Sequence, residues 1–475
     1  MMRSLALVPA LAAAAAPLPA LAHVTDRAFV LLLPTHLYAW GGGLAVALSF
    51  AVMALIPMTR LRAVRRLRLP LGELPRVAGA APSLVSLAVL AGLVVAGYVG
   101  DRDPLSNPLP TVVWTIWWVG FTLLHALAGN LWNVLNPWRG LHRLAAAVVP
   151  GVRERLLAYP RAIGFVPAIV LFFGFAWFEL VYEAPQDPAI LASAVIVYAA
   201  ITLAGMVAFG VRDWLHYGEA FSVFFRVVSW LSPLVGAADE RADGAPRRRL
   251  ALTVPGAGLL DIGTLRLSGV AFVLLALSSV SFDGLSRTFW WVALVGENPL
   301  EFPGRSAVLG VNTLGLAGVF AALFGVYALA VLAGRWLAGS QEGIVESLGR
   351  YVVAIVPIAF GYHFAHYLPA FIVDGQYAVR ALSDPFALGW NLFGTADMHV
   401  HAALLTNHAS VTLVYNLQVG GIVVVHVMAV VVAHFLALRR SGSARQAILG
   451  QIPMTVLMIG YTVFGLWLLS SPTIG

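Results

Sequence analysis

Two histidines three residues apart, His363 and His366, are the pair in this chain whose type and spacing most directly suggest chemistry. They belong to the run YHFAHY at 362–367, and residues at i and i+3 share one face of a helix. The run lies inside an apolar segment, where polar side chains usually face the interior of a helical bundle or a wet cavity. The pair is therefore a candidate for metal or haem ligation. The structural alternative is two histidines bonded to backbone carbonyls and tyrosine hydroxyls.

A second candidate is the segment Asp397-x-His399-x-His401. Alternate residues of an extended segment point to the same side, so both imidazoles can face one ligand. Two imidazoles with a nearby carboxylate suit zinc or manganese. Asp374, just beyond the YHFAHY run, is a further carboxylate. We expect Asp374 or Asp397 to act as a metal ligand or a general base. The alternatives are a solvated polar loop for the segment at 397–401 and a marker of the membrane boundary for Asp374.

Two more histidines extend the candidate ligand set. His426 lies in the middle of the next apolar segment, and it can approach the His363 and His366 face if the two segments pack together. His23 becomes the mature N-terminus if residues 1–22 are removed, and an N-terminal amine with its own imidazole can chelate Cu(II). Because the chain has no cysteine, any metal has to use histidine, carboxylate or methionine.

The composition is typical of a membrane protein. Hydrophobic residues make up 60% of the 475, and charged residues make up 11%, against about 25% in soluble domains. A single soluble core cannot bury so much apolar surface, so the lipid bilayer must act as solvent for the rest. The sequence therefore predicts an all-α, polytopic transmembrane bundle. The net charge of +7 comes from arginines in short loops, which encode membrane orientation rather than nucleic-acid binding.

Ten apolar runs are long enough to cross the hydrocarbon core. The expected spans are 35–57, 83–100, 111–131, 163–182, 189–210, 267–282, 306–334, 351–373, 410–437 and 447–470. Residues 1–22 have a basic start, a Leu/Ala-rich stretch and the ending Ala20-Leu21-Ala22, which is typical of a cleaved signal peptide. An uncleaved first span is the alternative. The rest, 23–475, is expected to form a single transmembrane domain.

The arginine-rich loop from Arg60 to Arg76 predicts the orientation, because such loops stay in the cytoplasm. Alternation from there places both mature termini on the outer, periplasmic side of a bacterial inner membrane. The segment 211–263 is expected to be cytoplasmic or interfacial, with an amphipathic helix near anionic headgroups. The loop 374–409 is expected on the outer side, and loops of that length often carry function.

Several segments resemble a family of bacterial polytopic proteins commonly labelled fenitrothion hydrolase, after a membrane-bound organophosphate hydrolase. The segments are PTHLYAWGGGLAVALSF (34–50), NLWNVLNPWRGLHRL (130–144), FFRVVSWLSPL (224–234), PIAFGYHFAHYLPAFIVDGQ (357–376) and VHVMAVVVAH (425–434). The resemblance implies hydrolysis of an aryl phosphotriester or phosphorothioate. It carries no catalytic motif, so no residue assignment rests on it.

Three functional hypotheses follow. In the first, a zinc, manganese or copper ion held by the histidines activates water against a small apolar ester in an outer cavity. In the second, the chain binds or passes copper or haem through His363, His366, His426 and His23 without hydrolysis. In the third, it is a permease in which the histidines pack or relay protons. Bound metal separates the first two hypotheses from the third.

Overall fold

The structure is a computed structural model that describes residues 35–57, 59–60, 67–74, 80–238, 248–402 and 407–474. The predicted signal peptide, 1–22, and the candidate ligand His23 lie outside the described residues. The described part of the chain is helical apart from one small sheet and the connecting loops, which confirms the expected helical bundle.

Among the described residues, nine helical segments are long and apolar enough to cross a membrane. They are Thr35–Met53 (α2), Ala81–Val99 (α4), Pro108–Ala128 (α5, η2 and α6), Pro188–Phe209 (α10), Leu267–Ser286 (α13), Arg305–Leu337 (α15), Ile344–Ser383 (α16, η8 and α17), His408–Leu438 (α18) and Ala444–Ser470 (α19). The remaining expected span, 163–182, contains Val166–Leu180 (α9), a helix of 15 residues. At 1.5 Å per residue, α9 is about 22 Å long, shorter than a hydrocarbon core of roughly 30 Å. The tenth span therefore stays a prediction.

Two of the long segments are composite. The third joins α5 (Pro108–Thr111), the π-helical stretch η2 (Val112–Phe121) and α6 (Thr122–Ala128). The segment 344–383 joins α16 (Ile344–Tyr351), η8 (Val352–Ile355) and α17 (Val356–Ser383). π-Helical turns are rare and often occur at functional sites, and η2 lines the cavities described below.

The nine long segments, together with α9, alternate in direction along the bundle, so the bundle has two ends. The arginine-rich end comprises 67–74, 129–165, 210–238, 248–266, 338–343 and 439–443, and the opposite end comprises 100–107, 181–187, 287–304, 384–402 and 471–474. Contacts support this division. At the arginine-rich end, the hydroxyl of Ser232 donates to the carbonyl of Leu127 at 2.9 Å. At the opposite end, the N–H of Ile474 donates to the carbonyl of Arg287 at 2.9 Å.

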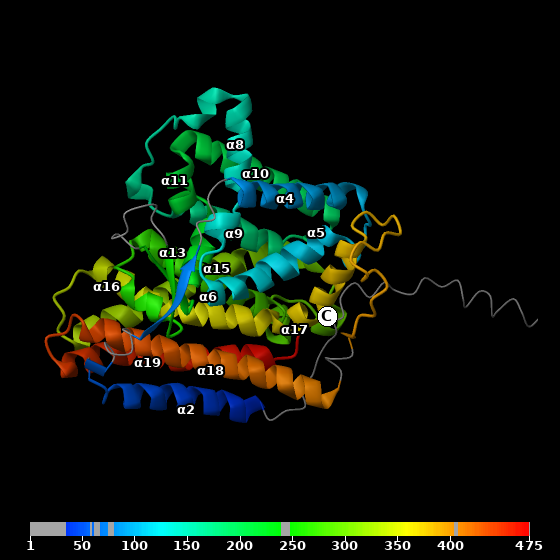
Figure 1. Cartoon of the computed structure of the whole chain (residues 1–475). Helices are drawn as coiled ribbons and strands as arrows, with labels where there is room; N and C mark the ends of the chain where they lie inside the picture. The colour runs from blue at the N-terminus through cyan, green and yellow to red at the C-terminus, as the bar shows by residue number, and fades with distance from the viewer. Residues whose placement is uncertain are drawn as a thin grey trace, which may run out of the picture.

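Helix α13 lies near the centre of the bundle and packs against α9, α15 and α17. In the most apolar 18-residue window of α13, 78% of the residues are buried inside the protein, whereas in the corresponding window of α15 the share is 17%. Figure 1 shows α2, α18 and α19 side by side along one edge and α4 with α10 towards the other. Helix α17 lies between these groups and contacts both α13 and α18. The two innermost helices, α13 and α17, therefore face each other across the core.

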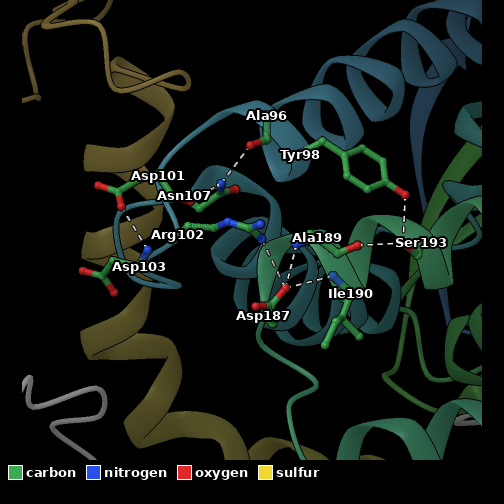
Figure 2. A network of polar contacts seen from close by, with 10 residues as sticks. All are labelled: Ala96, Tyr98, Asp101, Arg102, Asp103, Asn107, Asp187, Ala189, Ile190 and Ser193. Atoms are coloured by element: carbon green, nitrogen blue, oxygen red, sulfur yellow. Dashed lines mark hydrogen bonds and ion pairs between the residues drawn. The ribbon is translucent and has the colours of Figure 1, made fainter.

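At the opposite end of the bundle, a polar network holds together the end of α4 and the starts of α5 and α10 (Figure 2). The amide of Asn107 donates to the carbonyls of Ala96 and Asp101, at 2.9 and 2.7 Å. Asp187 caps α10 by accepting from the N–H groups of its first turn, at 2.9 and 3.0 Å, and lies 3.8 Å from Arg102. Side-chain caps satisfy backbone donors that a helix leaves unpaired. The side chains of Asn107 and Asp187 therefore hold these two loops in place.

The arginine-rich end carries a three-stranded antiparallel sheet in the order β1-β3-β2. Its strands are β1 (Arg68–Leu74), β2 (Leu234–Ala238) and β3 (Arg248–Thr253). The sheet departs from the purely helical expectation. Pro70 and Gly72 disfavour helix in β1, and the register shifts between them where β1 pairs with β3.

Short helices complete the two ends. They are α7 (Trp132–Leu135), α8 (Pro137–Val148), η3 (Pro150–Arg153), η4 (Arg161–Ile163), α11 (Val211–Asp213), η5 (Trp214–Gly218), α12 (Ala220–Ser229), η6 (Ala257–Asp261), α14 (Phe289–Leu294) and η7 (Pro299–Glu301). Helix α12 is the amphipathic helix of the 211–263 segment. Its side chains Phe221, Phe224 and Phe225 are buried in the main apolar core, and the helix packs against α6 and α9.

Candidate functional site

The centre of the candidate site is a contact between Asp283 on α13 and His366 on α17. Nε2 of His366 lies 2.8 Å from Oδ2 of Asp283. The Asp283 side chain is only 4% exposed, whereas that of His366 is 25% exposed. A histidine whose one ring nitrogen contacts a carboxylate is held in orientation, and its other nitrogen can face a water or a ligand. The pair therefore has the geometry of an oriented acid–base group.

Tyr367 connects this pair to a second carboxylate. Its hydroxyl lies 2.9 Å from Oδ2 of Asp283 and 3.0 Å from Oε1 of Glu179, which is the next-to-last residue of α9. The hydroxyl has one hydrogen, so it donates to one of the two carboxylates at a time and lies between two groups that would otherwise repel each other. Three helices, α9, α13 and α17, thus meet at one tyrosine.

Two arginines bring positive charge to the same place. Nε of Arg287 lies 3.3 Å from Oδ1 of Asp283, one turn further along α13. Arg305, the first residue of α15, donates to the carbonyl of Glu179 at 2.8 Å and to that of Tyr182 at 3.3 Å. Both guanidinium groups therefore sit at the opposite end of the bundle, beside the two carboxylates.

These charged groups line a cavity of about 310 Å³ at the opposite end. Its charged and titratable side chains include Glu179, Asp283, Arg287, Arg305, His366 and Asp374. The rest of the wall mixes apolar residues of η2, α13, α17, α18 and α19 with neutral polar side chains, among them Thr115, Gln186 and Thr473. Small-molecule sites are clefts of about 300–1,000 Å³ in which apolar walls carry convergent polar groups; this cavity is of that size, and its wall has a larger polar share.

A second, smaller cavity of about 30 Å³ lies against the first. The two share the lining residues Glu179, Leu180, Val280 and Tyr367. The smaller cavity extends from these residues to His363 and is otherwise walled mainly by apolar side chains. A volume of about 10–15 Å³ is enough for one water, so the smaller cavity has room for a water molecule beside Glu179 and Tyr367.

His363 and His366 do not point to a common ligand. Nε2 of His363 contacts the carbonyl oxygen of Trp118 at 3.1 Å, and its ring packs edge-on against the Trp118 ring at 4.8 Å between centroids. Nε2 of His366 instead contacts Asp283. Tyr367 packs against both rings, at 4.8 Å in each case. His363 thus matches the structural alternative, a histidine bonded to a carbonyl, while His366 belongs to the charged cluster.

His426 lies inside the bundle, away from the cavity lining. It is fully buried, and its Nδ1 contacts the carbonyl of Ile422 in its own helix at 2.8 Å. Its ring is 6.2 Å from that of Tyr362 between centroids. His434 is also buried and lies 3.2 Å from the amide of Gln451.

The outer segment brings two candidate ligands together. The rings of His399 and His401 lie 5.2 Å apart between centroids, and both residues and Asp397 are exposed. The N–H of His401 donates to the side chain of Gln376 on α17 at 2.9 Å, which ties the segment to that helix. Asp374 lines the main cavity from α17, whereas these two histidines are absent from its lining.

In the part of the chain that the structure describes, no group of three or more His, Asp or Glu side chains is arranged to hold a metal ion. The expected ligands are divided among three places: the cavity wall, the interior of the bundle and the outer segment. Metal binding therefore stays a prediction of the sequence, and no catalytic step below is derived through a metal.

Glu179, Asp283, Arg287 and Arg305 were not among the expected site residues, whereas His366 and Asp374 were. Glu179 and Asp283 are each the one charged residue in an otherwise uncharged run, FFGFAWFEL and SSVSFDGL. An ionisable residue inside a membrane segment is a functional candidate by default, and that signal could have identified both. Arg287, Arg305 and Tyr367 carry no such signal, because arginine and tyrosine are common at span ends.

The fold and the site define a class: a polytopic helical bundle of membrane-spanning type with a charged, water-accessible cavity at one end. No protein-family profile, curated protein or solved structure matches the chain. The cavity and the sequence resemblance are therefore the two features of the chain that point to a function.

Proposed function

We propose that the cavity at the opposite end is a hydrolytic acid–base site for a small apolar ester of phosphoric or phosphorothioic acid. The observation that carries the proposal is the His366–Asp283 contact on the wall of a 310 Å³ cavity. The resemblance to proteins labelled fenitrothion hydrolase supplies the substrate class. The apolar wall suits an uncharged ester, and the charged wall suits its phosphoryl group.

In the proposed reaction, His366 removes a proton from a water molecule while Asp283 orients the ring and stabilises the imidazolium. The water oxygen forms a bond to phosphorus as the bond to the aryloxide breaks. The aryloxide leaves as an anion, and the proton passes from His366 to solvent. A positioned general base contributes about 10²–10⁴-fold to the rate.

Arg287 and Arg305 have a separate role in this proposal. Attack at phosphorus places negative charge on the phosphoryl oxygen or sulfur, and fixed cationic donors stabilise such charge. Arg287 contacts Asp283 and Arg305 contacts the Glu179 carbonyl, so both guanidinium groups are held in place before substrate enters. Asp374 lines the cavity as a third carboxylate, beside Asp283 and Glu179, and can accept protons.

We further propose that the opposite end faces the periplasm across a bacterial inner membrane. The arginines of the loops at the other end support this orientation through the positive-inside rule. The chain would then take its substrate from the outer side or the outer leaflet, where an apolar ester accumulates.

A permease is the second candidate, and one observation favours it. Glu179 and Tyr367 line both the main cavity and the smaller cavity, which reaches His363. Buried carboxylates and histidines along such a route are typical of proton relays. Copper or haem handling, the other alternative from the sequence, stays a prediction.

The deciding experiment uses the purified full chain and a nitrophenyl phosphorothioate triester, whose product is coloured. We expect hydrolysis by the wild type and a loss of at least about 100-fold in His366→Gln. His399→Gln, which changes an exposed histidine outside the cavity lining, is the matched control and should retain the rate. Equal rates in all three proteins would reject His366 as the base. No hydrolysis by a folded wild type, together with proton-linked uptake in vesicles, would favour the permease.

A further inference from the structure

A second large pocket lies at the arginine-rich end. Its volume is about 500 Å³, and it is bounded by the segment 130–139, by α11 and η5, and by α12. Three arginines line it, one from each side: Arg139 from α8, Arg212 from α11 and Arg226 from α12. His216 and the asparagines of the NLWNVLN motif complete the polar wall. The pocket is independent of the proposed hydrolytic site.

The lining of this pocket is strongly cationic. Among its described lining residues there is no carboxylate. Two carboxylates of the same region are engaged elsewhere. Glu219 is fully buried and accepts from the N–H groups of Phe221 and Ser222, at 3.0 and 2.7 Å. Asp213 lies 3.5 Å from Arg155. The arginines are therefore not neutralised by the pocket wall itself.

The guanidinium groups are positioned by neutral neighbours. Arg226 donates to the carbonyl of His216 at 2.8 Å. Arg139 donates to the side-chain oxygen of Asn133 at 2.7 Å, while its Nε is buried without a hydrogen-bond partner. Burial and the neighbouring charge of Arg143 hold the pKa of Arg139 below its usual value. A buried donor without a partner among the described residues carries a cost, and an anion near this guanidinium group would offset it.

The asparagines of the motif line the pocket with neutral polar groups and hold the turn before α8 in its conformation. Asn136 caps α8 by accepting from the N–H of Trp138 at 2.9 Å, and its amide nitrogen lies 3.1 Å from the hydroxyl of Ser222. Asn130 accepts from the N–H of Asn133 at 3.1 Å. These bonds fix the turn from which Arg139 projects. The motif therefore builds one wall of a pocket, beyond its role in ending the third span.

We propose that this pocket binds a phosphate group, supplied either by an anionic phospholipid headgroup or by a soluble phosphate compound. The paired N–H groups of an arginine guanidinium and the N–H₂ group of an asparagine can donate to phosphate oxygens. Hydrogen bonds from a charged donor are about twice as strong as those between neutral groups. The pocket lies beyond the ends of α6 and α10, where spans leave the hydrocarbon and meet the headgroup layer. Its volume exceeds that of a bare phosphate ion and leaves room for the attached group.

The test uses the full chain in neutral detergent at constant ionic strength, with tryptophan fluorescence as the readout of thermal unfolding. One arm adds inorganic phosphate, and the other adds phosphatidylglycerol, with phosphatidylcholine as its uncharged control. We expect stabilisation in at least one arm. A response to phosphate alone identifies a soluble ligand, and a response to phosphatidylglycerol alone identifies a lipid.

Substitutions locate the binding. We expect Arg139→Gln and Arg212→Gln each to weaken the apparent affinity at least about tenfold, since each removes a charged donor. Arg143→Gln is the matched control, because Arg143 is exposed on the same helix as Arg139 and does not line the pocket. Arg212 is exposed, so its variant keeps the test decisive if the Arg139 variant does not fold. No stabilisation in either arm, or equal affinity in the wild type and both pocket variants, would overturn the proposal.

Discussion

His366 contacts Asp283 across 83 residues of sequence, and the 2.8 Å bond joins the two innermost helices of the bundle. Arg287 lies 3.3 Å from the other carboxylate oxygen of Asp283, and Tyr367 lies 2.9 Å from the first. Both oxygens of one buried carboxylate thus have partners from two helices. Asp283 is therefore the residue on which the geometry of the site depends.

This dependence predicts a large effect of Asp283→Asn on stability. The amide has the shape of the carboxylate, but it lacks the charge and presents an N–H₂ group to a partner that is itself a donor. Breaking one side of a buried charge pair costs about 3–5 kcal/mol. We expect a loss of that size in the free energy of unfolding, measured by detergent titration and circular dichroism. Asp397→Asn, on the exposed outer segment, should change it by less than about 0.5 kcal/mol. Equal effects would show that the Asp283 contacts contribute nothing.

Tyr367→Phe tests the bridge between the carboxylates. Without the hydroxyl, Glu179 and Asp283 lose a shared donor and face each other directly, which should cost about 1–3 kcal/mol. Glu179→Gln in the same chain removes one of the two charges, so the double variant should regain part of that loss. The measurement is a double-mutant cycle of unfolding free energies, with a coupling above about 0.5 kcal/mol expected. Strict additivity would contradict the bridge.

The spans were predictable from the sequence because bilayer thickness sets their length. Windows of about 20 apolar residues located nine segments that the structure makes long helices. Hydropathy cannot separate a span that faces lipid from one buried in protein, so the central place of α13 was not foreseen. The sheet was not predicted, for a different reason. Arg68 on β1 pairs with Thr253 on β3, and a pairing between residues so distant in the sequence leaves no local pattern.

The candidate site was predictable only in part. Helical spacing placed His363 and His366 on one helix, but spacing says nothing about what packs against each ring. Trp118 contacts one and Asp283 the other, and those neighbours come from η2 and α13. The side chains that complete the cluster converge only through the packing of α9, α13, α15 and α17, which a single sequence does not specify.

Close helix packing gives a prediction at Gly334 on α15. A Cβ at this position would clash with the carbonyl oxygen of Gly450 on α19, whereas a Cβ at Gly325 on the same helix would meet nothing within 4 Å. We expect Gly334→Ala to destabilise the bundle by about 1–3 kcal/mol, as overpacking does. Gly325→Ala should be neutral or stabilising by about 0.5–1 kcal/mol, because alanine favours helix. Thermal unfolding of both variants measures the difference, and equal unfolding temperatures would argue against the α15–α19 contact.

The proposed orientation can be tested cleanly because the chain has no cysteine. Glu154→Cys places a thiol at an exposed position of the arginine-rich end, and Asp397→Cys places one at an exposed position of the opposite end. In intact cells, a membrane-impermeant maleimide should label the Asp397→Cys chain and leave the Glu154→Cys chain unlabelled until the membrane is permeabilised, as the positive-inside rule requires. The reverse labelling pattern would place the His366 cavity on the cytoplasmic side of the membrane. The substrate would then have to come from within the cell, and a role in processing esters from the periplasm would be excluded.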